Sequence, residues 1–182
     1  MEQIDINIEN LRAGLPTLTP YDGSFFYEVA LFCLNENGHS SGVIATRTEG
    51  NCPQLSISWN SVLDKRAEYT YRDHAEAAEF GATGLAILYS LELTGHNTVE
   101  RSAKGTSFDY WIGDCKDEED ISLSRFERME ISGIFSSDNQ EVKKRFKIKQ
   151  KQISKSDAMK IPKIVFIFEF SNPLIAVERK DE

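Results

Sequence analysis

Two acidic residues, Asp109 and Glu130, occupy two short segments, residues 107–113 and 126–133, whose composition is typical of β-strands. Side chains alternate between the two faces of a strand, so the carboxylates can converge if these segments pair as a hairpin. Carboxylates held close together repel each other unless a proton or a divalent cation lies between them. Because hard divalent cations prefer oxygen ligands, the pair predicts a hard-metal site.

The segment before these strands has the pattern of a helix. Asp73, followed three residues later by Glu76, is typical of a helix N-terminus, and Gly95 stands where such a helix would end. Apolar residues recur between them at spacings of three and four, and Glu79 falls on this apolar stripe. A buried carboxylate is costly unless it is paired, hydrogen-bonded or bound to a cation. Glu79 is therefore a candidate functional residue, the alternative being a residue at the edge of the stripe that reaches solvent.

Positive charge is concentrated between residues 141 and 163. This stretch holds nine basic and two acidic residues, whereas the whole chain has a formal net charge of -8. Most of it belongs to a helix expected at about residues 139–153, with Asp138 as its cap. The segment predicts a docking surface for nucleic acid, or alternatively a solvated helix face. The candidate phosphate ligands are Lys143, Lys144, Arg145 and Lys147, together with Lys104 in the turn before the first acidic strand.

The sequence predicts an α+β protein whose first part, residues 1–68, is an antiparallel β meander. Its expected strands lie at residues 4–8, 25–34, 41–46 and 55–59, with an Asn-Gly turn after the second. This region carries no catalytic motif, and we expect it to be a scaffold or a surface for a homodimer or partner protein. Residues 69–182 form the second part of the chain, either as a separate domain or as one continuous domain with the first.

From residue 73 to residue 170 the expected order is helix, strand, strand, strand, helix, strand. This order resembles the common core of the PD-(D/E)XK nucleases, the restriction-endonuclease-like superfamily. The residues Gly105-Thr106-Ser107-Phe108-Asp109 are similar to the strand entry that carries the metal-binding aspartate of that family, and Glu130-Ile131-Ser132 is similar to its (D/E)-x-K element. Glu79 resembles the helical glutamate that many members add, and the resemblance implies that it is a third metal ligand beside Asp109 and Glu130. The resemblance covers roughly the last 110 residues. It implies a mixed central sheet and a Mg²⁺- or Mn²⁺-dependent endonuclease that hydrolyses phosphodiesters.

Ser132 stands where the family has its catalytic lysine. Lys149 is the preferred replacement, because it shares the inward stripe of the basic helix with Val142, Phe146 and Ile153, and Lys104 is the second choice. The catalytic candidates are thus Asp109, Glu130 and Lys149. A nuclease of this kind would fit defence or mobile-element biology. The alternatives are a catalytically silent nuclease-fold module that binds DNA or a partner protein, and an interaction protein in which the two acids are ordinary strand residues.

The remaining features of the chain predict a cytoplasmic protein. The first residues lack the basic start and apolar run of a signal peptide, and no stretch approaches the length of a membrane span. Three cysteines without a Cys-x-x-Cys pair argue against a disulfide framework or a thiolate zinc site. Five acids between residues 114 and 120 predict an exposed loop.

Overall fold

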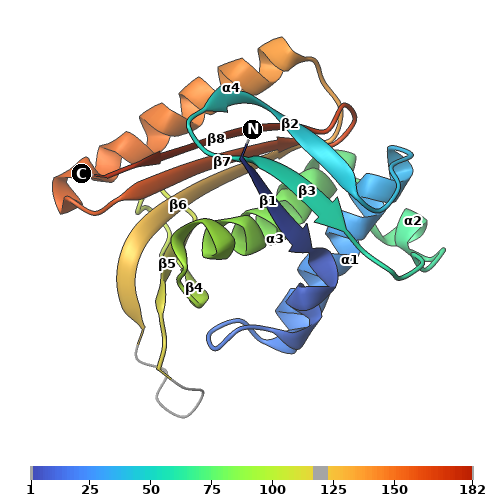
Figure 1. Cartoon of the computed structure of the whole chain (residues 1–182), viewed down its shortest axis with the longest axis horizontal. Helices are drawn as coiled ribbons and strands as arrows, with labels where there is room; N and C mark the ends of the chain where they lie inside the picture. Colours follow the sequence, from blue (N-terminus) through green and yellow to red (C-terminus); the bar gives the residue numbers. More distant parts are fainter. Residues whose placement is uncertain (1, 117–122, 182) are drawn as a thin grey trace.

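The computed structural model describes residues 2–116 and 123–181, which fold around one curled sheet (Figure 1). The strands are β1 (Gln3–Asn7), β2 (Val43–Gly50), β3 (Gln54–Ser58), β4 (Thr98–Arg101), β5 (Tyr110–Asp114), β6 (Ser124–Ile134), β7 (Lys163–Glu169) and β8 (Leu174–Lys180). The α-helices are α1 (Pro20–Glu36), α2 (Ala67–Thr70), α3 (His74–Thr94) and α4 (Asn139–Ile153). Two 3₁₀ helices, η1 (Ile8–Ala13) and η2 (Ser154–Met159), complete the described elements.

The sheet has eight strands among the described residues, in the order β1-β3-β2-β8-β7-β6-β5-β4. It is mixed: β4 with β5, β5 with β6 and β7 with β8 form antiparallel pairs, whereas β6 with β7 and β2 with β8 form parallel pairs. The curl gives it the form of a half-barrel, with α1 and α3 inside the curl and α4 on the opposite face (Figure 1). The α+β class predicted from the sequence is confirmed.

Two hydrophobic clusters hold the helices against the sheet. On the inner face, α3 packs on Met129 of β6 and Phe166 of β7, and α1 packs on α3 within the same cluster. On the outer face, the apolar stripe of α4 packs on Val165 and Ile167 of β7. Adjacent residues of β7 thus serve opposite clusters, as the alternation of a strand covered on both faces requires.

The strand predicted at residues 25–34 is wrong, because these residues lie within α1. The Thr19 side chain accepts a hydrogen bond from the backbone N–H of Asp22, and Pro20 occupies the first turn, two features that favour a helix start. Burial against α3 outweighs the strand preference of the aromatic and β-branched residues in this segment. The antiparallel meander is wrong for a second reason, since β1 pairs with β3 in parallel.

The element order predicted from residue 73 onward agrees with the structure, which runs α3, β4, β5, β6, α4, β7. The expected caps are also in place: Asp73 accepts hydrogen bonds at the start of α3, and Gly95 ends that helix with a φ of 76°. β2 pairs with β8, so strands from residues 1–68 and from the later part of the chain share one sheet. None of the described helices is long and apolar enough to cross a membrane. The predicted acidic loop lies largely outside the described residues.

Candidate active site

The hairpin of β5 and β6 brings Asp109 and Glu130 together. Its register aligns Tyr110 with Met129, which places Asp109, one residue before β5, across from Glu130. The backbone N–H of Asp109 donates to the carbonyl of Met129 over 2.9 Å. Directly opposed residues of an antiparallel pair have their Cβ atoms about 5 Å apart. The two carboxyl groups therefore belong to one site.

The site lies where β6 extends beyond the start of β5. At this open edge the backbone N–H of Ile131 donates to Asp109 Oδ2, and that of Gly133 donates to Glu79 Oε2, each over 2.9 Å. The two carboxylates thus accept the backbone hydrogen bonds that a neighbouring strand would otherwise accept at this edge of the sheet. Gly133 permits this arrangement, because a Cβ atom there would lie 1.9 Å from the carbonyl oxygen of Ala78 in α3.

Glu130 is the most unusual of these acids. Its residue is fully buried, and its Oε1 atom accepts a hydrogen bond from the ammonium group of Lys149. Its Oε2 atom is also buried and has no hydrogen-bond partner among the described residues. Burial, followed by the negative charge of Asp109, raises the pKa of Glu130 to about 7, although Lys149 acts in the opposite direction. This carboxyl group therefore exchanges a proton near neutral pH.

Lys149 reaches the site from α4, as predicted. Asp138 caps the helix by accepting a hydrogen bond from the backbone N–H of Glu141 over 2.9 Å. Val142, Phe146 and Ile153 are buried on the inward face of the helix, and the Lys149 side chain on that face is 19% exposed. The ammonium group thus lies beside Glu130, although it comes from α4 and not from β6, the strand that carries Glu130-Ile131-Ser132. Its catalytic role stays a prediction.

Glu79 joins the site from α3 but is engaged with β6. Its Oε1 atom accepts a hydrogen bond from Ser132 Oγ over 2.9 Å and lies 3.4 Å from Arg145 Nη1. Ser132 Oγ in turn accepts a hydrogen bond from Arg145 over 3.0 Å. In the described part of the chain, no three His, Cys, Asp or Glu side chains form a ready-made metal-binding group. The role of Glu79 as a metal ligand therefore stays a prediction.

A pocket of about 170 Å³ opens at this site. Among its walls are Glu79, Asp109 and Lys149, and also residues that the sequence analysis did not identify: Phe80, Thr83, Arg101 and Tyr110. The guanidinium of Arg101, at the end of β4, lies 5.7 Å from the centre of the Tyr110 ring. Nothing in the spacing of Arg101 along the chain indicates this placement, because it depends on the pairing of β4 with β5.

A larger pocket of about 560 Å³ adjoins the first, and both include Arg101 and Asp109 in their walls. The predicted phosphate ligand Lys104 lines this second pocket, and Lys155 of η2 lines it as well. The loop from Ser102 to Phe108 forms much of the wall, and Ser107 within it has a φ of 74°. Such a left-handed backbone is costly for a serine and is maintained here by neighbouring hydrogen bonds, including the 2.9 Å bond from Ser102 N to Asp109 O.

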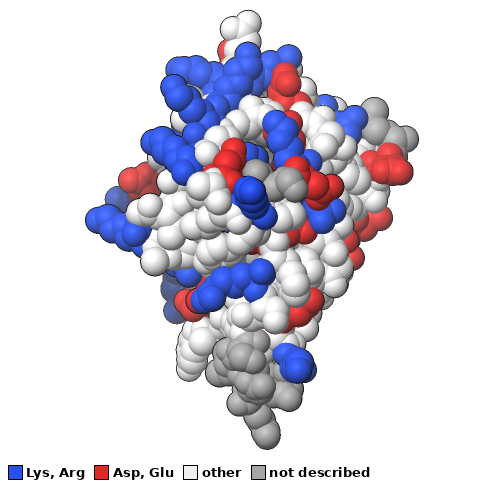
Figure 2. All heavy atoms as spheres, turned by 90° about the vertical axis from the view of Figure 1, so that its left-hand side faces the viewer, with Lys and Arg blue, Asp and Glu red and all other residues white. Residues whose placement is uncertain are grey.

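The other predicted phosphate ligands lie on α4. Figure 2 shows lysine and arginine side chains gathered toward the top of the face that it draws. Several of the predicted ligands contact acidic groups. Lys143 lies 3.2 Å from Glu49, Lys144 lies 3.5 Å from Glu141, and Arg145 contacts Glu79 as described above. Exposed pairs of this kind are weak, so the surface remains basic. Its binding of nucleic acid stays a prediction.

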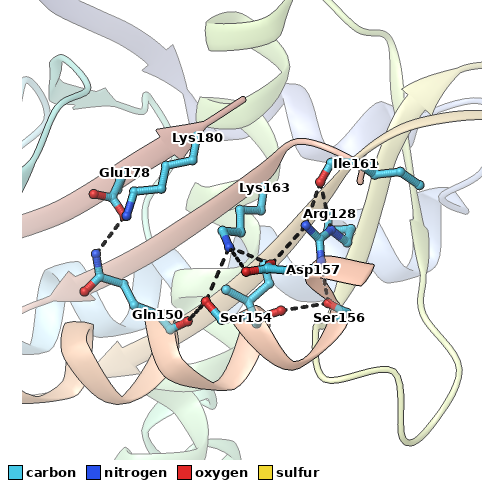
Figure 3. A network of polar contacts seen from close by, with 10 residues as sticks. Arg128, Gln150, Ser154, Ser156, Asp157, Ile161, Lys163, Glu178 and Lys180 are labelled. Atoms are coloured by element: carbon cyan, nitrogen blue, oxygen red, sulfur yellow. Dashed lines mark hydrogen bonds and ion pairs between the residues drawn. The ribbon is translucent and has the colours of Figure 1, made fainter. Parts of the chain in front are cut away.

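A polar network ties the end of α4 to the strand that carries Glu130 (Figure 3). Arg128, two residues before Glu130, is fully buried and donates to Ser156 Oγ and to the carbonyl of Ile161, each over 2.6 Å. It also lies 3.3 Å from Asp157, which accepts from Lys163 of β7 over 2.6 Å. Since η2 directly continues α4, this network fixes the helix of Lys149 relative to the strand of Glu130.

Comparison of the chain with protein-family models, with curated proteins and with solved structures found no match. No family is therefore shown for the chain.

Proposed function

We propose that the protein is a metal-dependent nuclease in which Asp109 and Glu130 hold Mg²⁺ or Mn²⁺ and Lys149 assists. The observation that carries the proposal is the buried Oε2 atom of Glu130, which lacks a partner among the described residues and lies beside a second carboxylate. A divalent cation supplies what this atom lacks, and oxygen donors are its preferred ligands.

The other buried glutamates among the described residues make this atom stand out. Glu169 is fully buried, and its oxygens accept hydrogen bonds from the backbone N–H groups of Ser137, Ser171 and Asn172. Glu127 is buried and pairs with Arg179 through two hydrogen bonds. A carboxylate with a purely structural role is thus fully satisfied in this fold, as burial demands. Glu130 departs from that pattern at the one place where a second acid and a lysine meet it.

The order of elements supports the same proposal. The run α3, β4, β5, β6, α4, β7, with antiparallel pairs followed by a parallel one, fits the restriction-endonuclease-like core that the sequence resembles. The two acids lie at the start of β5 and within β6, as that resemblance implies. A cytoplasmic setting, a defence or mobile-element role and a homodimer through the first strands stay predictions.

The residues of the site can divide the work of phosphodiester hydrolysis. A bound Mg²⁺ or Mn²⁺ would position water and neutralise charge that develops on the phosphate. Lys149 favours the ionised form of Glu130, because its positive charge opposes the rise in the pKa of that carboxyl group, and its ammonium can donate to a phosphate oxygen. Arg101 brings a second cation to the same pocket.

The proposal is tested by incubating the purified protein with single-stranded, duplex and branched DNA and RNA, with Mg²⁺, Mn²⁺ or EDTA. We expect cleavage that requires metal and disappears in Asp109→Asn, whose amide oxygen can still accept from Ile131 N but lacks the charge that holds a cation. Lys149→Ala should also abolish cleavage. Asp5→Asn, on the opposite edge strand β1, is the matched control and should cleave normally.

The alternative is a catalytically silent module, which Ser132 favours. Its hydroxyl bridges Glu79 and Arg145 and so joins α3 and α4 to β6, a structural use of the position where the family has its lysine. Wild-type protein that leaves every substrate intact with both metals would establish this reading over the nuclease.

A further inference from the structure

We infer that the pocket takes an unpaired strand of DNA or RNA, with bases stacked on Phe80, Phe25 and Tyr21 and phosphates along Arg101, Lys104 and Lys155. The inference rests on the proposed function for the place of the reaction, but it concerns binding and can be tested without cleavage. Two different surfaces meet at the pocket, and each suits a different part of a nucleotide.

The aromatic surface begins inside the pocket. Phe80 follows Glu79 in α3 and lines the same cavity as Asp109 and Lys149. The ring of Phe25 from α1 packs edge-on against Phe80, with ring centres 5.1 Å apart, and Phe25 is 37% exposed. Tyr21 lies one turn earlier on α1, on the same side of that helix, and is 90% exposed. The three rings thus lead from the pocket out to solvent.

The basic surface begins on the other side of Asp109. Arg101 lines both pockets, and the larger one continues past Lys104 to Lys155 in η2. These three residues are exposed, and their positive charges follow the wall of a groove that reaches Asp109. Such a groove suits a phosphate backbone, whose charge draws it to lysine and arginine regardless of base sequence.

An unpaired strand is the ligand that uses both surfaces. Stacking on an aromatic ring needs an open base face, which a duplex hides and a single strand exposes. Acidic groups flank the aromatic surface. Burial raises the pKa of Tyr110, Arg101 opposes the rise, and the negative charges of Asp109 and, least of all, Asp22 add to it, so Asp22, which follows Tyr21, lies near this side of the pocket. Glu28 accepts a hydrogen bond from Tyr71, whose ring lies 6.4 Å from Phe25. These negative charges repel phosphate, so the bases face the rings and the backbone faces the cations.

The experiment is fluorescence anisotropy with short labelled DNA and RNA strands, and with the duplexes formed from them, in EDTA so that nothing is cleaved. We expect single strands to bind at least tenfold more tightly than duplexes. Tyr21→Ala, at a position too exposed to affect folding, should weaken single-strand binding by about fivefold or more, since a base–ring stack contributes roughly 1–3 kcal/mol. Tyr69→Ala, which removes a tyrosine that is 73% exposed on α2 and lines neither pocket, is the matched control and should bind normally.

A second comparison tests the basic surface. It sets the double variant Lys104→Glu/Lys155→Glu against the double variant Lys143→Glu/Lys144→Glu on α4. The first pair should weaken binding more and should flatten its salt dependence by about 0.7 per lost contact, the value for single strands. Equal binding of duplex and single strand would overturn the inference, and so would unchanged single-strand binding by Tyr21→Ala. It would also be overturned if Tyr21→Ala lost self-association of the protein and not strand binding. Single-strand binding without any cleavage would support this inference and contradict the proposed nuclease activity. Cleavage of duplex that is unchanged in Tyr21→Ala would support the nuclease activity and contradict this inference.

Discussion

Replacing Glu130 by glutamine should make the protein more stable, and increasingly so as the pH rises. The folded protein raises the pKa of this carboxyl group from 4.5 to about 7, so between these values the folded state binds the proton that the unfolded chain has already released. Stability contributed by such a group is lost as the pH rises through this window. Glutamine has the shape of the protonated side chain and carries no charge, so the variant avoids the loss.

The pKa difference gives the magnitude. Ionising Glu130 costs about 3 kcal/mol more in the folded protein than in the unfolded chain, since one pKa unit corresponds to about 1.4 kcal/mol. The penalty is about 1 kcal/mol at pH 5 and about 3 kcal/mol at pH 8. The advantage of Glu130→Gln over wild type should therefore grow by about 2 kcal/mol between these pH values. Lys149 faces an uncharged partner in the variant at every pH, and its effect on the wild type is already contained in the raised pKa of Glu130.

The measurement is the Tm of both proteins from pH 5 to pH 8 in EDTA. For a chain of this length, about 2 kcal/mol corresponds to a relative gain of roughly 4–8 °C. Glu68→Gln, at an exposed position of α2, controls for the loss of one negative charge. An advantage of Glu130→Gln that stays constant with pH would show that Glu130 does not hold its proton in the folded protein, and the argument from its buried oxygen would fall with it.

Three further predictions follow from the same site. Mg²⁺ or Mn²⁺ should raise the Tm of the wild type more at pH 8 than at pH 5, because the cation competes with the proton on Glu130, and Asp109→Asn should abolish the shift; equal shifts in both proteins would exclude this site. Arg128→Met should lower the free energy of unfolding in urea by about 2–4 kcal/mol, because it leaves buried acceptors unpaired, whereas Arg125→Met, which breaks an exposed pair, should cost less than about 1 kcal/mol. Gly133→Ala should destabilise by about 2 kcal/mol or more, because its Cβ atom would push α3 away from β6; unchanged urea unfolding would contradict that close approach.

Local patterns in the sequence determined the elements from α3 to β7 and the pairing of the two acids. Asp73, Gly95 and Asp138 act on helix ends through contacts with backbone groups a few residues away, so their effect can be predicted without the fold. The same holds for Asp109 and Glu130, since alternation and a hairpin suffice to place two residues opposite each other. The inward stripe of α4 likewise indicated Lys149.

Tertiary structure decided the remainder. The segment from residue 25 to residue 34 has a strand-like composition, but packing against α3 inside the curl makes it a helix, which no local pattern reveals. Arg101 enters the pocket because β4 pairs with β5, and Phe80 enters it because α3 packs on β6; their positions along the chain are unrelated to those of the acids. Helix caps and strand alternation act over a few residues, whereas a pocket is built by contacts between elements far apart in sequence. The partners of Glu130, and the oxygen that it leaves without one among the described residues, therefore became visible only in the folded chain.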